Sequence, residues 1–197
     1  MGKIKLFIYG AGGHGRVIGD IALRNRYDIE FIDDENNNFL NFDEFCNSFK
    51  KANIIIGIGN NQIRKEKTEL CEKLGYNLIT LIDKSAIIGN NVKIEQGSVV
   101  MPNCVINNSA VIGKGVIINT GAIIEHDCII DDFSHISPNA ALAGAVKVGQ
   151  ETHIGIGSSI IERINIGDNV IIGAGSVVIR DIENNTKVVG IPAKVRF

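Results

Sequence analysis

The spacing of hydrophobic residues changes near residue 84, and this change divides the chain into two parts. Before it, short aliphatic runs alternate with stretches in which apolar residues recur at helical spacing. The runs predict strands at 5–10, 29–34, 53–59 and 76–82, and the other stretches predict helices at 16–26 and 60–75. A polar loop rich in asparagine separates the second strand from the third. This alternation predicts an α/β N-terminal domain, a small Rossmann-like parallel sheet with helices, over residues 1–83.

From Ser85 onward the hydrophobic period is six residues. Every sixth residue from Ile88 to Val178 is isoleucine, leucine or valine. Two positions earlier the residue is Ala, Val, Ser, Cys or Thr in every hexad except the one that contains Ile164. This pattern is typical of a parallel β-helix, in which three hexads form one triangular coil and the large side chains fill the interior. We therefore predict a β-helix of hexapeptide repeats over residues 84–197, without long loops and with a short C-terminal tail.

His126 occupies a corner of this predicted β-helix, where polar, small or proline residues form an exposed turn. Glu125 and Asp127 flank it in the sequence. Residues 18 apart lie on neighbouring coils about 4.8 Å from each other, so His126 is expected between Asn108 and Gly144. We expect the glycine to leave open space beside the imidazole, which a thin substrate could occupy.

The residues alone leave two readings of His126 open. An exposed corner histidine is often a solvated turn residue, but a neighbouring carboxylate can fix the tautomer of an imidazole and support general-base chemistry near neutral pH. His135 and His153 are also 18 residues apart, which predicts that they stack on one face of the surface. Cys104 and Cys128 fall in the small inward phase and are expected in the core.

Charge and composition exclude several classes of function. The net charge of −2 and the pI near 6.1 provide no general attraction to nucleic acid or to anionic membranes. No apolar run approaches the roughly 18 residues of a membrane span, and the N-terminus resembles a first strand more than a signal peptide. The four cysteines are scattered, which favours reduced thiols. We expect a cytoplasmic protein that neither binds nucleic acid nor inserts into a membrane.

A glycine-rich loop, Gly10-x-Gly12-x-x-Gly15, follows the first predicted strand. Such a loop offers backbone N–H groups and a helix N-terminus to a diphosphate. Asp33 and Asp34, at the end of the second predicted strand, can accept hydrogen bonds from a ribose or a base. The loop also fits the dinucleotide fingerprint, but about 80 residues form only one mononucleotide half of such a fold, so we do not expect a nicotinamide cofactor.

Five segments, "IYGAGGHGRV", "IGNNQIRK", "NTGAIIEHDCII", "FSHIS" and "VVGIPAK", together resemble one family. The chain resembles the nucleotide-sugar and sialic-acid acyltransferases of the left-handed β-helix superfamily. It is most similar to the N-acetyltransferases that use acetyl-CoA to acetylate UDP-4-amino-4,6-dideoxy sugars on the way to bacillosamine. The resemblance implies a homotrimer without a metal. Acetyl-CoA would lie between two β-helices, and the N-terminal domain would present the nucleotide-linked amino sugar to it.

The resemblance also assigns residues, motif by motif. His126 corresponds to the general base, supported by Asp127 or Glu125. The residues implied for acetyl-CoA binding are Asn119, His135, Gly144, Ile156 and Ala174. Those implied for the nucleotide sugar are Gly12, Gly13, His14, Asp33, Asp34, Gly59 and Asn60. Relatives often have a lysine soon after the acidic pair, whereas this chain continues "DDENNN".

Three alternatives stay open at this point. The first is O-acetylation of a sialic acid, and the second is a GDP- or dTDP-linked amino sugar. The third is a zinc-dependent carbonic anhydrase, which uses the same coil but needs a closely spaced histidine pair, whereas His126 and His135 are nine residues apart. The sequence determines neither the nucleotide base, the sugar stereochemistry nor the acyl length, and spacing does not choose between Glu125 and Asp127.

Overall fold

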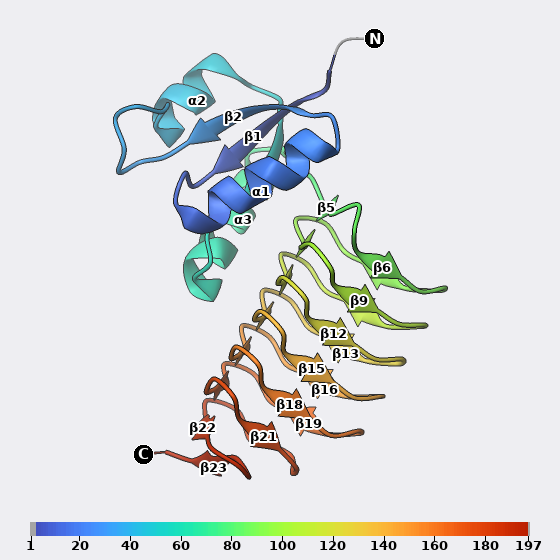
Figure 1. Ribbon diagram of the computed structural model, residues 1–197. Helices are drawn as coiled ribbons and strands as arrows, with labels where there is room; N and C mark the ends of the chain where they lie inside the picture. Colours follow the sequence, from blue (N-terminus) through green and yellow to red (C-terminus); the bar gives the residue numbers. More distant parts are fainter. Residues whose placement is uncertain (1–2, 197) are drawn as a thin grey trace.

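The computed structural model describes residues 3–196, which form an α/β domain on one side of the first coils of a β-helix (Figure 1). The α/β sheet is parallel with strand order β2-β1-β3-β4, which confirms the predicted sheet. Its strands are β1 (Lys5–Tyr9), β2 (Asp28–Ile32), β3 (Asn53–Ile56) and β4 (Asn77–Leu78), and its helices are α1 (Gly13–Arg24), α2 (Phe42–Ser48) and α3 (Asn61–Lys73). Met1, Gly2 and Phe197, which the predicted domains include, lie outside the described residues.

Helix α2 lies in the segment that we predicted to be a polar loop. Its N-terminus is a capping box, in which Asn41 Oδ1 accepts from the Glu44 N–H at 2.9 Å and Glu44 accepts from the Asn41 N–H at 3.0 Å. Phe42 and Phe45 are buried against the α/β sheet. The asparagine-rich composition led to the prediction of a loop. The capping box and the two phenylalanines three residues apart are the sequence features that indicate a helix here.

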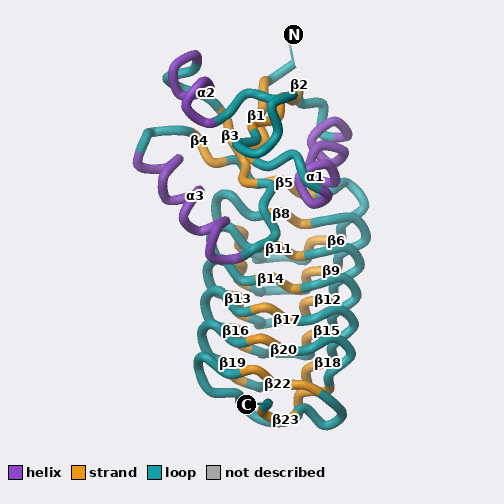
Figure 2. The backbone as a smooth tube through the Cα atoms, turned by 90° about the vertical axis from the view of Figure 1, so that its left-hand side faces the viewer, coloured by secondary structure: helices purple, strands orange, loops and turns teal. Residues whose placement is uncertain are grey.

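The β-helix consists of three sheets that run along its length and meet at three corners (Figure 2). The first sheet contains β5 (Leu81–Ile82), β8 (Val99–Val100), β11 (Ile117–Ile118), β14 (His135–Ile136), β17 (His153–Ile154), β20 (Ile171–Ile172), β22 (Lys187–Val189) and β23 (Lys194–Val195). The second contains β6 (Ile87–Ile88), β9 (Val105–Ile106), β12 (Ile123–Ile124), β15 (Ala141–Leu142), β18 (Ser159–Ile160) and β21 (Val177–Val178). The third contains β7 (Lys93–Ile94), β10 (Val111–Ile112), β13 (Ile129–Ile130), β16 (Lys147–Val148) and β19 (Asn165–Ile166).

The six-residue period is confirmed by burial and by backbone conformation. The aliphatic position of each hexad is buried from Val100 to Val178, whereas Ile88 is 37% exposed because no coil precedes it. At each corner from Asn91 to Gly175, one residue per hexad has a positive φ, including bulky Phe133 at 59°. Such a residue turns the chain sharply, and stacking of identical corners compensates its steric cost.

The ends of the β-helix differ from the prediction. The strand predicted at 76–82 divides into β4, which belongs to the α/β sheet, and β5, which pairs with β8. The β-helical pairing therefore begins at Leu81, close to the boundary predicted between residues 83 and 84. At the other end Ile171 pairs with Lys187, so the last coil is two residues shorter than the regular 18, and β23 then returns antiparallel to β22.

Arg64 of α3 fixes the α/β domain to the β-helix. Its side chain is only 1% exposed, and α3 descends beside the corner between the third and first sheets (Figure 2). Within the β-helix the guanidinium donates to the carbonyl oxygens of Gly115 at 2.7 Å and Phe133 at 2.6 Å. Within the α/β domain it donates to the carbonyl oxygens of Ile58 at 3.2 Å and Gly59 at 3.1 Å. One buried cation thus holds both parts of the chain through neutral acceptors.

The substitution Arg64→Leu should lower the free energy of unfolding by about 3–5 kcal/mol, because it leaves several buried carbonyl groups without a donor. Chemical denaturation followed by circular dichroism measures this loss. The matched control is Arg180→Leu, since Arg180 is exposed, and it should change stability by less than about 0.5 kcal/mol. Equal stability of the two variants would contradict the role assigned to Arg64.

Candidate active site

The glycine-rich loop and the start of α1 form a site for an anion. A Cβ at Gly15 would overlap the carbonyl oxygen of Gly10, so close packing of the loop requires glycine there. Side chains at Gly12 or Gly13 would instead meet open space. Helix α1 has no side-chain cap, which leaves its first N–H groups free to donate to a ligand. Asp33 Oδ2 accepts from the Ala11 N–H at 2.8 Å and holds the loop in this shape.

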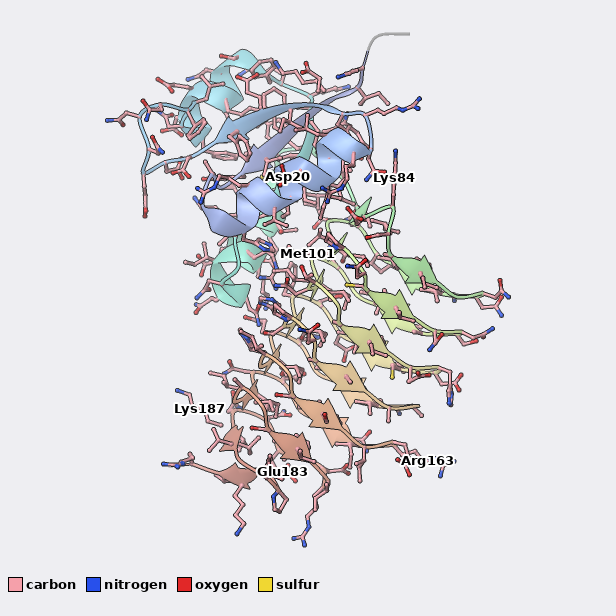
Figure 3. The ribbon with its side chains drawn as sticks, viewed as in Figure 1. Asp20, Lys84, Met101, Arg163, Glu183 and Lys187 are labelled. Carbon is pink, nitrogen blue, oxygen red and sulfur yellow. The ribbon has the colours of Figure 1, made fainter. Side chains whose placement is uncertain are left out.

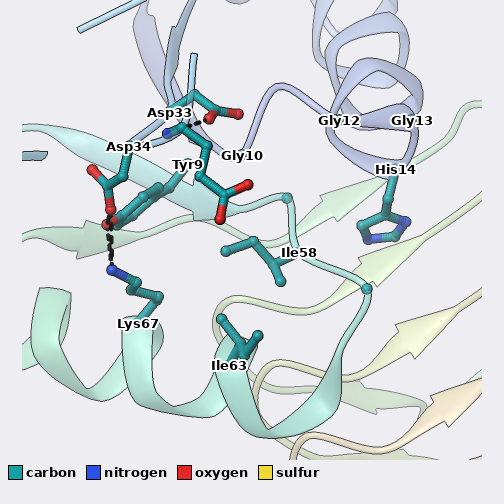
Figure 4. A pocket seen from close by; sticks show the side chains of 13 residues that line it. Tyr9, Gly10, Gly12, Gly13, His14, Asp33, Asp34, Ile58, Ile63 and Lys67 are labelled. Carbon is teal, nitrogen blue, oxygen red and sulfur yellow. Dashed lines mark hydrogen bonds and ion pairs between the residues drawn. The ribbon is translucent and has the colours of Figure 1, made fainter. Parts of the chain in front are cut away.

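A cavity of about 450 Å³ opens in front of this loop (Figure 4). It is lined by six of the seven residues implied for nucleotide-sugar binding: Gly12, Gly13, His14, Asp33, Asp34 and Gly59. Asn60 does not line it, because its side chain caps α3 by accepting from the Ile63 N–H at 3.0 Å. Asn60 instead borders a hollow of about 240 Å³ between α3 and the first sheet.

Sequence analysis missed six residues that line the cavity: Tyr9, Glu35, Gly57, Ile58, Ile63 and Lys67. Ile63 and Lys67 are four residues apart in α3, so they share one face of the helix, and this spacing was the available signal. Lys67 lies 3.2 Å from Asp34 Oδ2, which places an ammonium beside the acidic pair although no lysine follows that pair in the sequence.

Tyr9, Asp34 and Lys67 form a hydrogen-bonded cluster at one end of the cavity (Figure 4). The Tyr9 hydroxyl donates to Asp34 Oδ2, and Lys67 Nζ donates to the Tyr9 oxygen at 2.6 Å. Burial alone would raise the pKa of Asp34, but the donors Tyr9, Phe42 N–H and Lys67 outweigh it and lower that pKa. Asp34 is therefore ionised at neutral pH.

Three histidines meet where the α/β domain covers the first sheet. The ring centroids of His14 and His135 are 6.4 Å apart, and those of His135 and His153 are 4.8 Å apart. The predicted stacking of His135 on His153 is confirmed, but the prediction that both lie on the surface is wrong for His135. It is only 9% exposed, because the α/β domain lies over it.

His135 has a defined tautomer and one free donor. Asn119 Oδ1 accepts from the Thr120 N–H, so the Asn119 amide nitrogen points to His135 Nε2, 3.0 Å away. Since that nitrogen is the acceptor, the ring proton is on Nδ1. His135 Nδ1 and His14 Nε2 are buried and have no hydrogen-bond partner among the described residues. Both ring nitrogens are enclosed by protein where the α/β domain lies on the first sheet.

The three histidines are neutral at pH 7. Burial, helped by the Arg64 cation, lowers the pKa of His14 to about 4. Burial, His153 and Arg64 lower the pKa of His135 to about 3. The pKa of His153 is also lowered, by burial and by Arg64.

His126 lies at the corner between the second and third sheets, with its side chain 61% exposed, as predicted for a corner. Its Nδ1 lies 2.8 Å from Asp127 Oδ2, so among the described residues Asp127 contacts the imidazole and Glu125 does not. The expected open space beside Gly144 is absent, because a Cβ there would lie 2.6 Å from the Cε1 of His126. The ring itself covers Gly144, so the glycine makes room for the histidine and not for a ligand.

The remaining residues implied for acetyl-CoA lie elsewhere on the β-helix. His135 is on the first sheet and Asn119 directly follows β11 of that sheet, whereas Ile156 and Ala174 are exposed on neighbouring coils of the corner between the first and second sheets. Gly144 lies with His126 at the corner between the second and third sheets, the corner farthest from the first sheet. A single chain therefore does not bring all of these residues together.

Figure 3 shows this separation. Arg163 marks the corner of His126 two coils further along, and Lys187 marks the first sheet. The two side chains lie on opposite sides of the β-helix, and α3 with the cavity lies on the side of the first sheet. His126 thus points away from the cavity of its own chain.

Within residues 3–196, no group of three or more His, Cys, Asp or Glu side chains is arranged to hold a metal ion. No helix in that range has the length and apolar character that crossing a bilayer requires. Cys104 and Cys128 are buried as predicted, and burial raises the pKa of each thiol to about 11. Neither can act as an exposed nucleophile.

Known proteins are similar to each part of the chain. Residues 5–70 match the family described as the PglD N-terminal domain. The chain is 40% identical over 111 residues to the UDP-N-acetylbacillosamine N-acetyltransferase of Bacillus subtilis (strain 168). That alignment covers 48% of this chain and 50% of the relative, so the chain spans about half the length of this curated relative.

Several solved structures match almost the whole chain. The acetyltransferase domain of PglB from Neisseria gonorrhoeae FA1090 is 38% identical, with a TM-score of 0.92 and coverage of 98% of this chain and 99% of that one. Another structure of this domain contains acetyl coenzyme A. A variant of perosamine N-acetyltransferase from Caulobacter crescentus, in complex with CoA and GDP-perosamine, is 29% identical, with a TM-score of 0.94 and coverage of 98% and 97%.

Acid should weaken the docking of the two domains. His14 and His135 have pKa values in the folded state that are below the roughly 6.5 of an unfolded histidine, so the folded state disfavours their protonation. Their stabilising effect is complete above about pH 6.5 and decreases as the pH falls toward the folded values. Between about pH 6 and pH 4, each should lower the free energy of unfolding by about 1.4 kcal/mol per pH unit. Urea denaturation at a series of pH values measures the slope, which His135→Asn should reduce by about 1.4 kcal/mol per pH unit; an unchanged slope would contradict this origin.

Proposed function

Because the chain belongs to the family of sugar N-acetyltransferases that join a PglD-type N-terminal domain to a left-handed β-helix, we propose that it acetylates a nucleotide-linked amino sugar. Acetyl-CoA is the donor, and the acceptor is the C4 amine of a 4-amino-4,6-dideoxy sugar. The observation that carries this proposal is the position of the cavity, whose His14 end lies against His135 of the β-helix. A sugar bound there lies next to the β-helix, where we place acetyl-CoA.

The cavity supports one orientation of the nucleotide sugar. The diphosphate accepts hydrogen bonds from the N-terminus of α1, at Gly12 and Gly13. The sugar extends toward His14 and the β-helix, because its amine must meet the thioester. The nucleoside therefore extends the other way, toward Tyr9, Asp34 and Lys67.

The reaction needs a proton acceptor and a donor for the developing oxyanion. His126 Nδ1 donates to Asp127, which leaves Nε2 free to take the proton that the amine loses as it attacks the thioester carbonyl. The free Nδ1–H of His135 can donate to the oxyanion of the tetrahedral intermediate. The intermediate then collapses, the C–S bond breaks, and the CoA thiolate takes up a proton. No acyl-enzyme is required, since Cys104 and Cys128 are buried.

A complete site requires a second copy of the chain, and we propose a homotrimer. His126 and Gly144 project from the corner opposite the cavity, so a neighbouring chain must bring them to the cavity's His14 end. The outward side of the second sheet supports an interface, because it carries an apolar ladder of Ile87, Val105, Ile123 and Ala141, which Ser159 separates from Val177. Ile87 is 63% exposed and Ile123 is 39% exposed in the single chain.

We also propose a cytoplasmic location, because the cysteines of the described residues are free thiols, which are typical of a reducing compartment.

Two nucleotides are supported by different relatives. The Bacillus subtilis enzyme acts on a UDP-linked sugar, but its alignment covers 50% of that protein. The Caulobacter crescentus enzyme holds GDP-perosamine, and its similarity covers 98% of this chain. We propose the UDP-linked sugar as substrate because identity is higher with the UDP-sugar enzyme, and the GDP-linked sugar is the second candidate.

The purified protein should release CoA thiol from acetyl-CoA fastest with a UDP-4-amino-4,6-dideoxy sugar. The panel contains the matching dTDP- and GDP-linked sugars and free sialic acid, and a thiol reagent measures the rate. Preference for the GDP-linked sugar would select the second candidate. Activity on sialic acid alone would indicate an O-acetyltransferase, and no activity on any acceptor would contradict the proposed function.

Substitutions at the corner that holds His126 test the proposed roles of His126, Asp127 and Glu125 in this reaction. His126→Ala should lower kcat by about 10²–10⁴-fold. Asp127→Asn should lower kcat more than Glu125→Gln, because Asp127 alone contacts the imidazole.

Mixing two inactive variants tests whether neighbouring chains share the site. His126→Ala removes the base, and Gly13→Asp places a negative charge where the diphosphate should bind. In randomly mixed trimers, an intact cavity meets an intact His126 at about one quarter of the interfaces, so about a quarter of the wild-type activity should return. The comparison is each variant alone after the same unfolding and refolding. Failure of a mixture with verified mixed trimers to recover activity would place His126 and the cavity in the same chain.

A further inference from the structure

We propose that Lys67 and Asp34 together read the nucleobase and select bases whose edge presents a carbonyl oxygen beside an N–H group. Uracil, thymine and guanine have such an edge, whereas cytosine and adenine present an amino group beside an unprotonated ring nitrogen. This inference rests on the proposed function, since it assigns a role to the nucleoside end of the same cavity.

The first support for this proposal is the position of Tyr9, Asp34 and Lys67 at one end of the cavity. We place the diphosphate at the start of α1, where Gly12 and Gly13 lie beside His14, and His14 marks the end of the cavity next to the β-helix (Figure 4). The opposite end is formed by Tyr9, Asp34 and Lys67. A sugar that reaches the β-helix leaves this opposite end to the nucleoside.

The surface between these ends suits a flat ring. Ile58 and Ile63 line the cavity, and Ile63 is 44% exposed although it points into a concave surface (Figure 4). Burial of an exposed isoleucine side chain against the apolar face of a ligand is favourable. The faces of a base supply such a partner, while its edge remains free for hydrogen bonds.

The hydrogen-bonding positions that Lys67 and Asp34 leave unused are the ones that the edge of a base would meet. An ammonium carries three N–H donors, and Lys67 uses two of them on Tyr9 Oη and Asp34 Oδ2. An ionised carboxylate has about four acceptor positions. Those of Asp34 receive the Tyr9 hydroxyl, the Lys67 ammonium and the Phe42 N–H. Lys67 retains one N–H donor, and the remaining acceptor position of Asp34 is on Oδ1, the carboxylate oxygen that receives the Phe42 N–H and not the one that Lys67 contacts.

This pair matches one pattern of base edge. The free N–H of Lys67 donates to a carbonyl such as O4 of uracil or O6 of guanine, and Asp34 accepts from the adjacent ring N–H. Cytosine would oppose its amino group to the ammonium and its ring nitrogen to the carboxylate, so both contacts would be repulsive. Adenine has the same mismatch. Selection thus comes from lost hydrogen bonds together with unpaired charge.

The test measures binding of UDP, GDP, CDP and ADP to the whole protein by isothermal titration calorimetry, without acetyl-CoA. UDP and GDP should bind at least about tenfold more tightly than CDP and ADP. Lys67→Met should reduce that ratio to less than about threefold, whereas Lys67→Arg should retain most of it, because a guanidinium still donates. Lys73→Met is the matched control, since Lys73 is in the last turn of the same helix and outside the cavity, and it should leave the ratio unchanged.

The ratio of these affinities distinguishes recognition of the base from a merely structural role of Lys67. If the role were structural, the substitution would weaken the binding of all four nucleotides equally. Equal binding of all four by the wild-type protein would overturn the proposal but leave the proposed function intact. An unchanged ratio in a folded Lys67→Met variant would also overturn it. Absence of binding by every nucleotide would instead contradict the nucleotide-sugar function itself.

Discussion

The buried guanidinium of Arg64 is the interaction on which the active-site geometry depends. It is surrounded by carbonyl oxygens from both domains, so its desolvation is compensated only when the α/β domain is docked on the β-helix. The carbonyls of Ile58 and Gly59 that it holds belong to residues that line the cavity. The same contact that joins the domains therefore shapes the cavity wall and sets its distance from His135.

The β-helix contributes rigidity and strict placement. Because three hexads make one coil, the residue number alone assigns a side chain to a sheet or a corner, and stacked backbone hydrogen bonds hold it there. His126, for example, accepts a hydrogen bond through its carbonyl from the Ala145 N–H at 2.9 Å, while its ring covers Gly144. A site built on such corners has little freedom to adjust within one chain, and the homotrimer that we propose would bring the corner of a neighbouring chain to the cavity.

The sequence predicted what depends on periodicity and missed what depends on docking. The period of six gave the coil, the corner position of His126, its neighbour Gly144 and the buried cysteines. It could not show that the α/β domain would cover His135, since the hexad pattern distinguishes only inward from outward positions of the β-helix and does not show which outward positions another domain covers. Nor could it find Lys67, because the partners Tyr9 and Asp34 come from β1 and from the end of β2, far away in the sequence. The choice of Asp127 over Glu125 likewise needed a backbone conformation, the positive φ of 60° at Asp127.

The charge of Arg64 links this architecture to chemistry. The cation contributes to the low pKa values of His14, His135 and His153, so the cluster facing the cavity stays neutral at pH 7. The same field would act on the amine of a bound sugar and favour its uncharged form, which is the nucleophile. A neutral His135 meanwhile keeps its Nδ1–H as a donor without adding a second cation to the site. Docking and histidine protonation thus depend on one buried charge, and in the proposed reaction activation of the amine would depend on it too, so a change that separates the domains would affect all three.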